Sequence, residues 1–301
     1  MPCTPGGSTT PLLGLCKPAE GETGWTAAIN GNWDLIDTLS GETGLPRSYL
    51  AGCGLTRSDS TLTRVTVAAG QCKGADQTSD MTLTTNITKD LAGSWVVGNN
   101  QNGLFAGTAT QNTWYHVFLI GDLSVTPNII DAGFDTSVAA ANRPGAYSAY
   151  RRLGSVRTAT NNTNIIGWKQ RGDEFWLNAA TIDANVTNPG TGAALRTLFS
   201  PVDVRCKAFG VLGLDRGATG VDTVAYASDP DTNDMTPSPT LAPLGQVMHP
   251  ATGAAGDDEA SWFETWTNTS SQIRTRLNAS AADTIFRICT YGWLDRRGKD
   301  E

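Results

Sequence analysis

The stretch WYHVFLI, residues 114–120, carries apolar or aromatic side chains at both odd and even positions. A strand with one face in water alternates apolar and polar side chains, so a run without alternation predicts a central strand buried on both faces. Two other stretches do alternate and predict half-buried strands: LTRVTV (62–67) and MTLTTNIT (81–88), the second with one face made of Met81, Leu83, Thr85 and Ile87.

The composition favours a mainly β chain. Among the 301 residues there are 33 glycines and 14 prolines, and Ser, Thr and Asn are abundant, as in short strands joined by tight turns. The net charge of -7 offers no basic surface for phosphates, so we expect no nucleic-acid partner. No window approaches the ~20 apolar residues of a membrane span, and the first residues lack signal-peptide features. We therefore expect that the chain folds in the cytoplasm and does not insert into a membrane.

Further strands are expected in the second half of the chain. NIIGWKQRGDEFWL (164–177) predicts a hairpin with its turn at Arg171–Asp173. The composition changes near residues 178–192, which gives an expected β domain at 49–178 and a second at 179–301. The strand spacing in the second domain is typical of an antiparallel β-sandwich or jelly roll, with candidate strands at 201–214, 222–227, 271–278 and 284–294.

The first 48 residues have a different pattern. Residues 1–20 are rich in Pro and Gly, which predicts an extended arm that is ordered by another surface. Residues 21–41 predict a short amphipathic helix, whose apolar stripe is Trp25, Ile29, Trp33 and Ile36. So short a helix is marginal alone in water, so the stripe must pack. Two alternatives stay open: packing against its own domain, and packing against copies of the chain or a docking partner.

The sequence offers little for catalysis. The two histidines, His116 and His249, lie in no nucleophile motif, and the glycine spacing matches no phosphate-binding loop. The cysteines include no C-x-x-C pair, so no zinc site is expected. Asp229 and Asp231 begin a calcium-loop pattern that fails at Asp234, where glycine is needed. We expect no catalytic residue, no cofactor and no metal, and hence no enzyme.

Tryptophan is the more informative residue, since the chain has nine. Large aromatic rings belong in cores and subunit interfaces, and they also stack on ligands when exposed. Both alternatives apply to four of them, which are the candidate contacts for a glycan: Trp168, Trp176, Trp262 and Trp266.

Three stretches resemble the structural proteins of tailed bacteriophages, in particular fibre and appendage proteins. They are PLLGLCKPAEGETGWTAAINGNWDLIDTL (11–39), residues 112–158 together with the hairpin IIGWKQRGDEFWL, and IRTRLNASAADTIFRICTYGWLDRRGKDE (273–301). In such proteins a short N-terminal helix typically helps to trimerise the chain or to dock it to the particle. The resemblance implies a virion protein assembled in the bacterial cytoplasm, with residues 1–48 as the attachment segment.

The resemblance leads to one main expectation and two alternatives. The main one is a homotrimeric fibre or appendage that binds other virion proteins of the tail, neck or capsid and contacts a bacterial surface glycan. The alternatives are a head-decoration or cement protein and a tailspike-type polysaccharide hydrolase, although the internal repeat usual in such hydrolases is missing from the sequence. Disulfides formed after lysis are also expected, with four candidates: Cys3, Cys16, Cys53 and Cys72. Cys206 and Cys289 are expected to be buried small apolar residues.

Overall fold

The computed structural model describes residues 8–9, 16–17, 44–215, 220–251 and 258–299. Within these residues the chain is mainly β and the sheets are largely antiparallel, as the sequence predicts; they contain no helix. The first two strands, β1 (Ser8–Thr9) and β2 (Cys16–Lys17), pair with each other. The helix expected at 21–41, with Trp25, Ile29, Trp33 and Ile36, lies outside the described residues.

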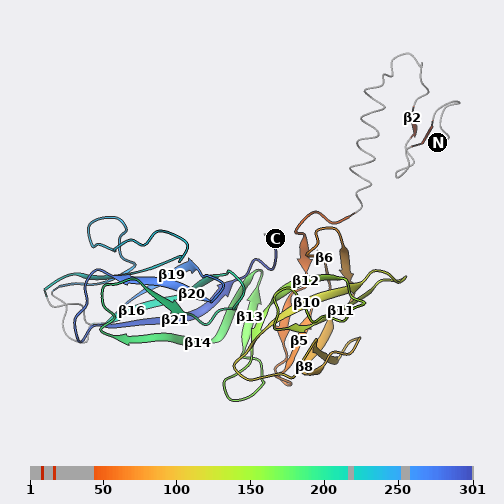
Figure 1. The fold of residues 1–301 in the computed structure, drawn as a ribbon, viewed down its shortest axis with the longest axis horizontal. Helices are drawn as coiled ribbons and strands as arrows, with labels where there is room; N and C mark the ends of the chain where they lie inside the picture. Colours follow the sequence, from red (N-terminus) through yellow and green to blue (C-terminus); the bar gives the residue numbers. More distant parts are fainter. Residues whose placement is uncertain (1–7, 10–15, 18–43, 216–219, 252–257, 300–301) are drawn as a thin grey trace, which may run out of the picture.

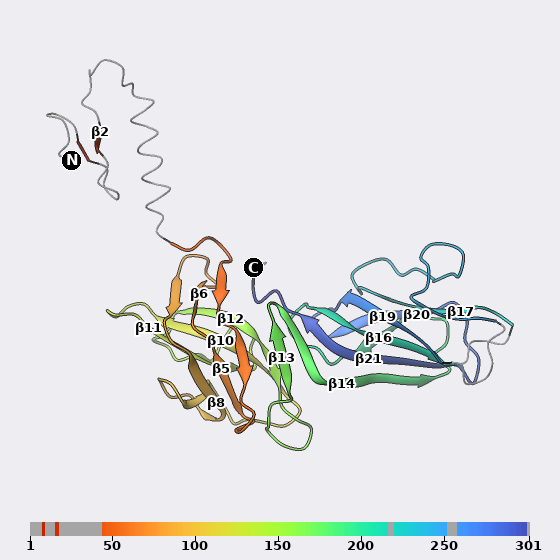
Figure 2. The same ribbon diagram turned by 180° about the vertical axis from the view of Figure 1, so that it is seen from behind.

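The other strands form two lobes, which Figures 1 and 2 show from opposite sides. The N-terminal lobe holds a seven-stranded sheet in the order β12-β10-β11-β9-β8-β5-β4 and a three-stranded sheet in the order β3-β6-β7. In the seven-stranded sheet β9 runs parallel to β8 and β11, and the other pairs are antiparallel. The strands of this lobe are β3 (Leu50–Gly52), β4 (Leu55–Arg57), β5 (Arg64–Val67), β6 (Gly70–Lys73), β7 (Asp80–Leu83), β8 (Ile87–Ser94), β9 (Gln101–Leu104), β10 (Trp114–Asp122), β11 (Ile129–Asp135) and β12 (Ala149–Arg157).

This lobe tests two of the strands predicted from the sequence. β10 is buried along its whole length between β11 and β12, which confirms the central strand. The single strand expected at 81–88 is wrong, because the chain turns after Leu83 and resumes as β8 in the other sheet. Asn86 holds this turn by accepting the Ala69 N–H at 2.9 Å. Thr85 is therefore exposed and does not share a buried face with Met81.

The C-terminal lobe consists of two antiparallel sheets that enclose a core. A five-stranded sheet has the order β13-β14-β21-β16-β19, and a four-stranded sheet has the order β15-β20-β17-β18. Side chains from both sheets fill the space between them, among them Leu212, Phe263 and Phe286 from the first sheet and Ala225 and Ile273 from the second. The strands are β13 (Trp168–Arg171), β14 (Glu174–Thr187), β15 (Ala194–Thr197), β16 (Lys207–Asp215), β17 (Thr223–Ser228), β18 (Val247–His249), β19 (Asp258–Trp266), β20 (Gln272–Leu277) and β21 (Ile285–Leu294).

The predicted hairpin forms from β13 and β14, with Arg171 opposite Glu174. β14 then continues to Thr187 and pairs with β21, so the expected boundary at residue 178 falls inside a strand. The strand expected at 201–214 begins at Lys207. Asp203 has a φ of 59°, in the left-handed region that strands do not adopt. Residues 198–206 therefore form a connection that reaches the junction of the two lobes.

The junction is an aromatic cluster, and the core of the N-terminal lobe continues through it. Trp293 lies at its centre, with its ring centroid 5.4 Å from that of Trp114 and 5.6 Å from that of Phe175. Phe199 contacts Trp114, and Trp168 contacts Phe175, each at 5.5 Å. Rings at such distances bury large apolar areas, so the cluster fixes the two lobes against each other.

The segment after β21, residues 295–299, closes the junction. Figure 1 shows the chain returning here from the C-terminal lobe. Arg297 is 5% exposed, and its guanidinium donates to the carbonyls of Leu153 at 2.8 Å and Cys53 at 2.6 Å. The Arg151 side chain donates in return to the Arg297 carbonyl at 3.0 Å. This C-terminal segment therefore links strands of the N-terminal lobe that are far apart in the sequence.

Candidate functional site

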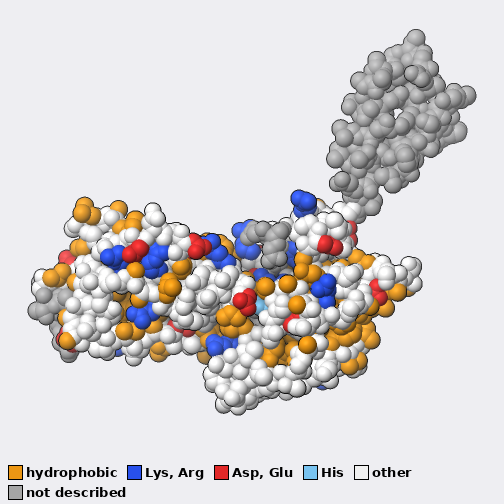
Figure 3. Space-filling view, viewed as in Figure 1, with side chains coloured by type: hydrophobic (Ala, Val, Ile, Leu, Met, Phe, Trp, Pro, Cys, Tyr) orange, Lys and Arg blue, Asp and Glu red, His pale blue; other side chains and the backbone are white. Residues whose placement is uncertain are grey.

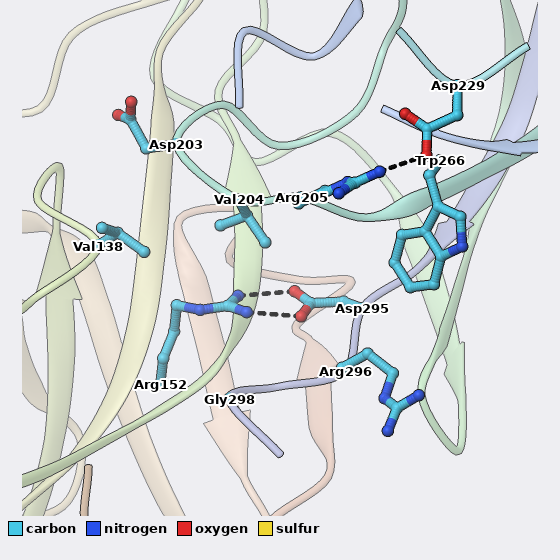
Figure 4. A pocket seen from close by; sticks show the side chains of 10 residues that line it. All are labelled: Val138, Arg152, Asp203, Val204, Arg205, Asp229, Trp266, Asp295, Arg296 and Gly298. Carbon is cyan, nitrogen blue, oxygen red and sulfur yellow. Dashed lines mark hydrogen bonds and ion pairs between the residues drawn. The ribbon is translucent and has the colours of Figure 1, made fainter. Parts of the chain in front are cut away.

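A cavity of about 500 Å³ lies where the two lobes and the C-terminal segment meet. Figure 4 shows its lining, which combines three arginines, three aspartates, one tryptophan and small residues: Val138, Arg152, Asp203, Val204, Arg205, Asp229, Trp266, Asp295, Arg296 and Gly298. Arg152 comes from β12, Trp266 ends β19, and Asp229 follows β17. The site thus exists only when distant parts of the chain are folded together.

The floor of the cavity is a buried ion pair. Two guanidinium nitrogens of Arg152 donate to the two carboxylate oxygens of Asp295, at 2.7 and 2.6 Å, and the Arg297 N–H donates to the same carboxylate at 2.8 Å. Burial by itself raises the pKa of Asp295, but the charge and hydrogen bonds of Arg152 outweigh it, so the pKa lies below its ordinary value. Asp295 is therefore ionised at neutral pH.

His116 and Ser155 continue this network away from the cavity. The His116 Nδ1 and the Ser155 hydroxyl are 2.8 Å apart, and Arg152 reaches the same hydroxyl at 3.4 Å. Burial and the neighbouring Arg152 charge lower the pKa of His116 to about 4, so its ring is neutral at neutral pH. Both side chains are fully buried, which gives a Ser–His pair that no substrate reaches.

The rim of the cavity carries a second set of charges. Arg205 pairs with Asp229 and, at 2.9 Å, with Asp231. Its guanidinium carbon also lies 6.0 Å from the ring centre of Trp266. Asp203, Arg205 and Arg296 are exposed, while Asp229 and Trp266 are half-buried. The aspartates of the calcium-loop pattern are thus engaged by an arginine. Across the described ranges, no group of His, Cys, Asp or Glu is arranged to hold a metal ion.

A second candidate surface covers the outer face of the five-stranded sheet. We call it the aromatic face; its members are Trp176, Phe209, Trp262 and Tyr291. Strand alternation places these rings opposite the core residues Phe263 and Phe286. The Trp262 centroid lies 6.3 Å from that of Trp176, 5.8 Å from that of Phe209 and 5.7 Å from that of Tyr291. Trp262 remains 48% exposed and Tyr291 37% exposed, so the cluster presents rings to solvent.

Polar side chains border the aromatic face. The Trp176 indole N–H donates to Glu174 at 2.8 Å, and Arg171 lies 5.5 Å from the Trp176 ring centre. Lys207 pairs with Glu264 beside Trp262. Figure 3 shows that basic and acidic side chains are interspersed on the C-terminal lobe on the face it presents. This mixture gives no extended surface of one sign.

The structure separates the four tryptophans that the sequence offers as glycan contacts. Trp176 and Trp262 come together on the aromatic face, and Trp266 lines the cavity. Trp168 is 5% exposed and packs on Phe175 in the core. The expectation that Trp168 offers a ring to a ligand is therefore wrong, because it lies on the inward side of the hairpin.

Cys53, Cys72, Cys206 and Cys289 are free thiols, so the disulfide expectation has no support at Cys53 and Cys72. Cys53 and Cys72 are 0% exposed, and a thiol of another chain cannot reach them. They interact with each other: a hydrogen bond from the Cys72 thiol lowers the pKa of Cys53 and raises that of Cys72. Cys206 is buried as expected, whereas Cys289 is partly exposed, since it points to the outer face of β21. Cys3 and the side chain of Cys16 lie outside what the structure describes.

Comparison with known protein families, curated proteins and solved structures finds no match for this chain. Among the described residues, no helix has the length and apolar character needed to cross a membrane.

Sequence reasoning missed most of the cavity. Arg152 and Asp295 stand in strand and turn segments with no motif around them, and their pairing depends on the return of the C-terminal segment. A signal was present for Arg205, because a charged residue beside the apolar positions of 201–206 fits an irregular connection better than a central strand.

Proposed function

We propose that this protein is a structural component of a phage virion, a fibre or appendage held to the particle by residues 1–48. Its β lobes project and contact a glycan of the bacterial surface. The resemblance of three sequence stretches supports the virion part of the proposal, and the aromatic face supports the contact part. The proposal gives the protein a binding role and no catalytic one.

The observation that carries the contact part is the exposure of Trp262 and Tyr291 on a sheet. A chain that only needed a core would bury such rings, since each can remove a large apolar area from water. The sheet fixes their positions before any ligand arrives, so binding costs little ordering entropy. The polar groups beside them, Glu174, Lys207 and Glu264, are suited to the hydroxyls of a sugar.

Several finer features belong to this proposal. The protein forms a homotrimer through the stripe of Trp25, Ile29, Trp33 and Ile36, it contacts other virion proteins, and it is found in the virion. The C-terminal lobe is a β-sandwich with jelly-roll-like connectivity.

Two experiments test the proposal. Electron microscopy of particles with an antibody against the β lobes locates the protein; we expect it on a tail or neck appendage, and labelling of the capsid surface favours a head-decoration role. Deletion of residues 1–48 should abolish incorporation while the β lobes remain folded. Truncated protein that still enters particles contradicts the attachment role.

The contact part is tested separately. Purified protein should bind isolated host surface polysaccharide, and Trp262→Ala should weaken binding by about tenfold, the loss expected for one stacked ring. Leu241→Ala is the matched control, since Leu241 is an exposed apolar residue elsewhere on the lobe. Equal binding by the two variants contradicts a role for the aromatic face.

A further inference from the structure

The cavity between the lobes has the size and the position of a small-molecule site. At about 500 Å³ this cavity falls within the roughly 300–1,000 Å³ of small-molecule sites. It also lies at a junction between lobes, where such sites are common.

The charges of its lining balance. Arg152, Arg205 and Arg296 oppose Asp203, Asp229 and Asp295, so the lining carries three charges of each sign. Arg152 is already bonded to Asp295, and Arg205 to Asp229. A charged ligand would be attracted by one sign and repelled by the other, and it would compete with these ion pairs. A neutral ligand meets no such penalty.

The same groups suit a ligand with several hydroxyls. A guanidinium only donates hydrogen bonds and an ionised carboxylate only accepts them, whereas a hydroxyl does both. Adjacent hydroxyls can therefore bond an arginine and an aspartate of the rim at once. The ion pair between Arg205 and Asp229 holds both side chains in place before binding, which limits the entropy lost on binding.

Trp266 supplies the apolar part of the site. Its ring is half-buried and borders the cavity beside Asp229, as Figure 4 shows. Val138 and Val204 add apolar surface to the lining. A sugar ring has C–H groups on its faces and hydroxyls at its edge, so it matches an aromatic ring set among planar polar groups.

We propose that this cavity binds one ring of a neutral saccharide, with Trp266 against a face of the sugar and Asp203, Asp229, Arg205 and Arg296 at its hydroxyls. The inference goes beyond the proposed function, because the cavity is separate from the aromatic face and the binding does not require a virion. A role of the cavity in host recognition would, however, rest on the proposed function.

The test uses the full chain and a panel of small probes. Ligand-observed NMR and calorimetry measure binding of galactose, glucose, mannose, N-acetylglucosamine and rhamnose, with glucuronate and inorganic phosphate as charged probes. We expect a neutral sugar to bind more tightly than either charged probe. Trp266→Ala should weaken its binding about tenfold, and Trp266→Phe should keep most of it.

Further variants separate the sites and control for folding. Arg205→Ala removes an exposed rim group, so it should weaken sugar binding while the thermal unfolding temperature stays near that of the wild type. Leu241→Ala, at an exposed apolar residue elsewhere on the lobe, should leave binding of the small sugar unchanged, and Trp262→Ala shows whether a sugar binds the aromatic face instead.

Three results overturn the inference: no neutral sugar binds at up to about 50 mM, far above the Kd of a weak specific site; a charged probe binds in preference; or Trp262→Ala removes the binding while Trp266→Ala does not. The last result places sugar on the aromatic face and leaves the proposed function standing. A neutral sugar bound through Trp266 by a protein that is absent from particles supports the cavity and defeats the virion role.

Discussion

Arg152 and Asp295, 143 residues apart in the sequence, form two side-by-side hydrogen bonds that join β12 to the C-terminal segment. Both side chains are almost fully buried. A buried ion pair adds little stability compared with apolar residues of the same size, but loss of one partner leaves an uncompensated charge. The folded state is therefore stable only when the C-terminal segment brings Asp295 to Arg152.

Asp295→Ala should lower the free energy of unfolding by about 3–5 kcal/mol, because it leaves the Arg152 guanidinium buried without its carboxylate. Urea unfolding followed by tryptophan fluorescence measures this. Asp231→Ala is the control: it removes a carboxylate from an exposed pair with Arg205 and should cost less than about 1 kcal/mol. Similar losses for the two variants would mean that the pair at the junction is solvated.

The pH dependence of stability should contain an acid-labile contribution from His116. Its pKa of about 4 in the folded protein lies below the value of about 6.5 expected for the unfolded chain. As the pH falls, the unfolded chain binds the proton first. The stabilisation from neutral His116 is thus complete above pH 6.5 and is lost as the pH falls to about 4, which lowers the free energy of unfolding by about 3 kcal/mol.

Asp183 should act in the opposite direction. Burial raises its pKa to about 6 against the hydrogen bonds that it accepts from Phe199 and Thr290. Between about pH 4 and pH 6 the folded protein keeps this proton after the unfolded chain has lost it. The stabilisation from protonated Asp183 is therefore present below about pH 4 and is lost as the pH rises to about 6, which lowers the free energy of unfolding by about 3 kcal/mol.

The two contributions largely cancel in the wild type, and single variants should reveal them. Between pH 6.5 and 4, Asp183→Asn should lose stability on acidification more steeply than the wild type, and His116→Asn should lose less or gain. Urea unfolding at several pH values gives the slopes. Identical slopes for the three proteins would show that neither group titrates as we infer.

Thiol labelling should distinguish Cys289 from the buried cysteines. In a Cys3→Ser, Cys16→Ser background, Cys289 should react with a maleimide in the folded protein, slowly because burial raises its pKa. Cys53, Cys72 and Cys206 should react only after unfolding, since they are 0% exposed. Mass spectrometry of peptides reads out each site. Labelling of Cys53 or Cys72 at the rate of Cys289 would contradict their burial.

Gly292 in β21 should tolerate no side chain. A Cβ there would lie 2.2 Å from the Phe175 carbonyl oxygen and 2.8 Å from the Phe209 ring, between the junction and the aromatic face. Gly292→Ala should cost about 2–3 kcal/mol through overpacking. Gly145→Ala, at an exposed glycine with no atom within 4 Å of the added Cβ, should change stability by less than about 0.5 kcal/mol. Thermal and urea unfolding compare the pair.

Local pattern was sufficient for the strands that hydrophobicity defines. The run at 114–120, which has apolar side chains on both faces, lies within β10, and the hairpin around Gly172 forms where its turn residues occur. Pattern failed at 81–88, where alternation continues through a turn that Asn86 fixes by a contact with Ala69. It also missed β12, a strand whose two buried arginines look like surface residues until their partners are known.

The candidate sites were less accessible to sequence reasoning than the fold. Residue type suggested Trp262 and Trp266, but only the pairing of β16 with β19 and β21 shows which rings meet. Nothing in the order of residues indicates that Asp295 and Asp229 border one space. Such sites arise from contacts between distant segments, which periodicity over short windows cannot register.

The position of Arg297 also constrains how the protein can be made. Cys53 emerges from the ribosome long before Arg297, which lies 244 positions later in the chain and whose guanidinium donates to the Cys53 carbonyl. Domains usually fold as they emerge during synthesis, but here the early lobe gains the hydrogen bonds of Arg297 only after residue 297 has been added. Polypeptides that terminate early lack this closing contact, and they should be preferred substrates for cellular proteases over the finished product.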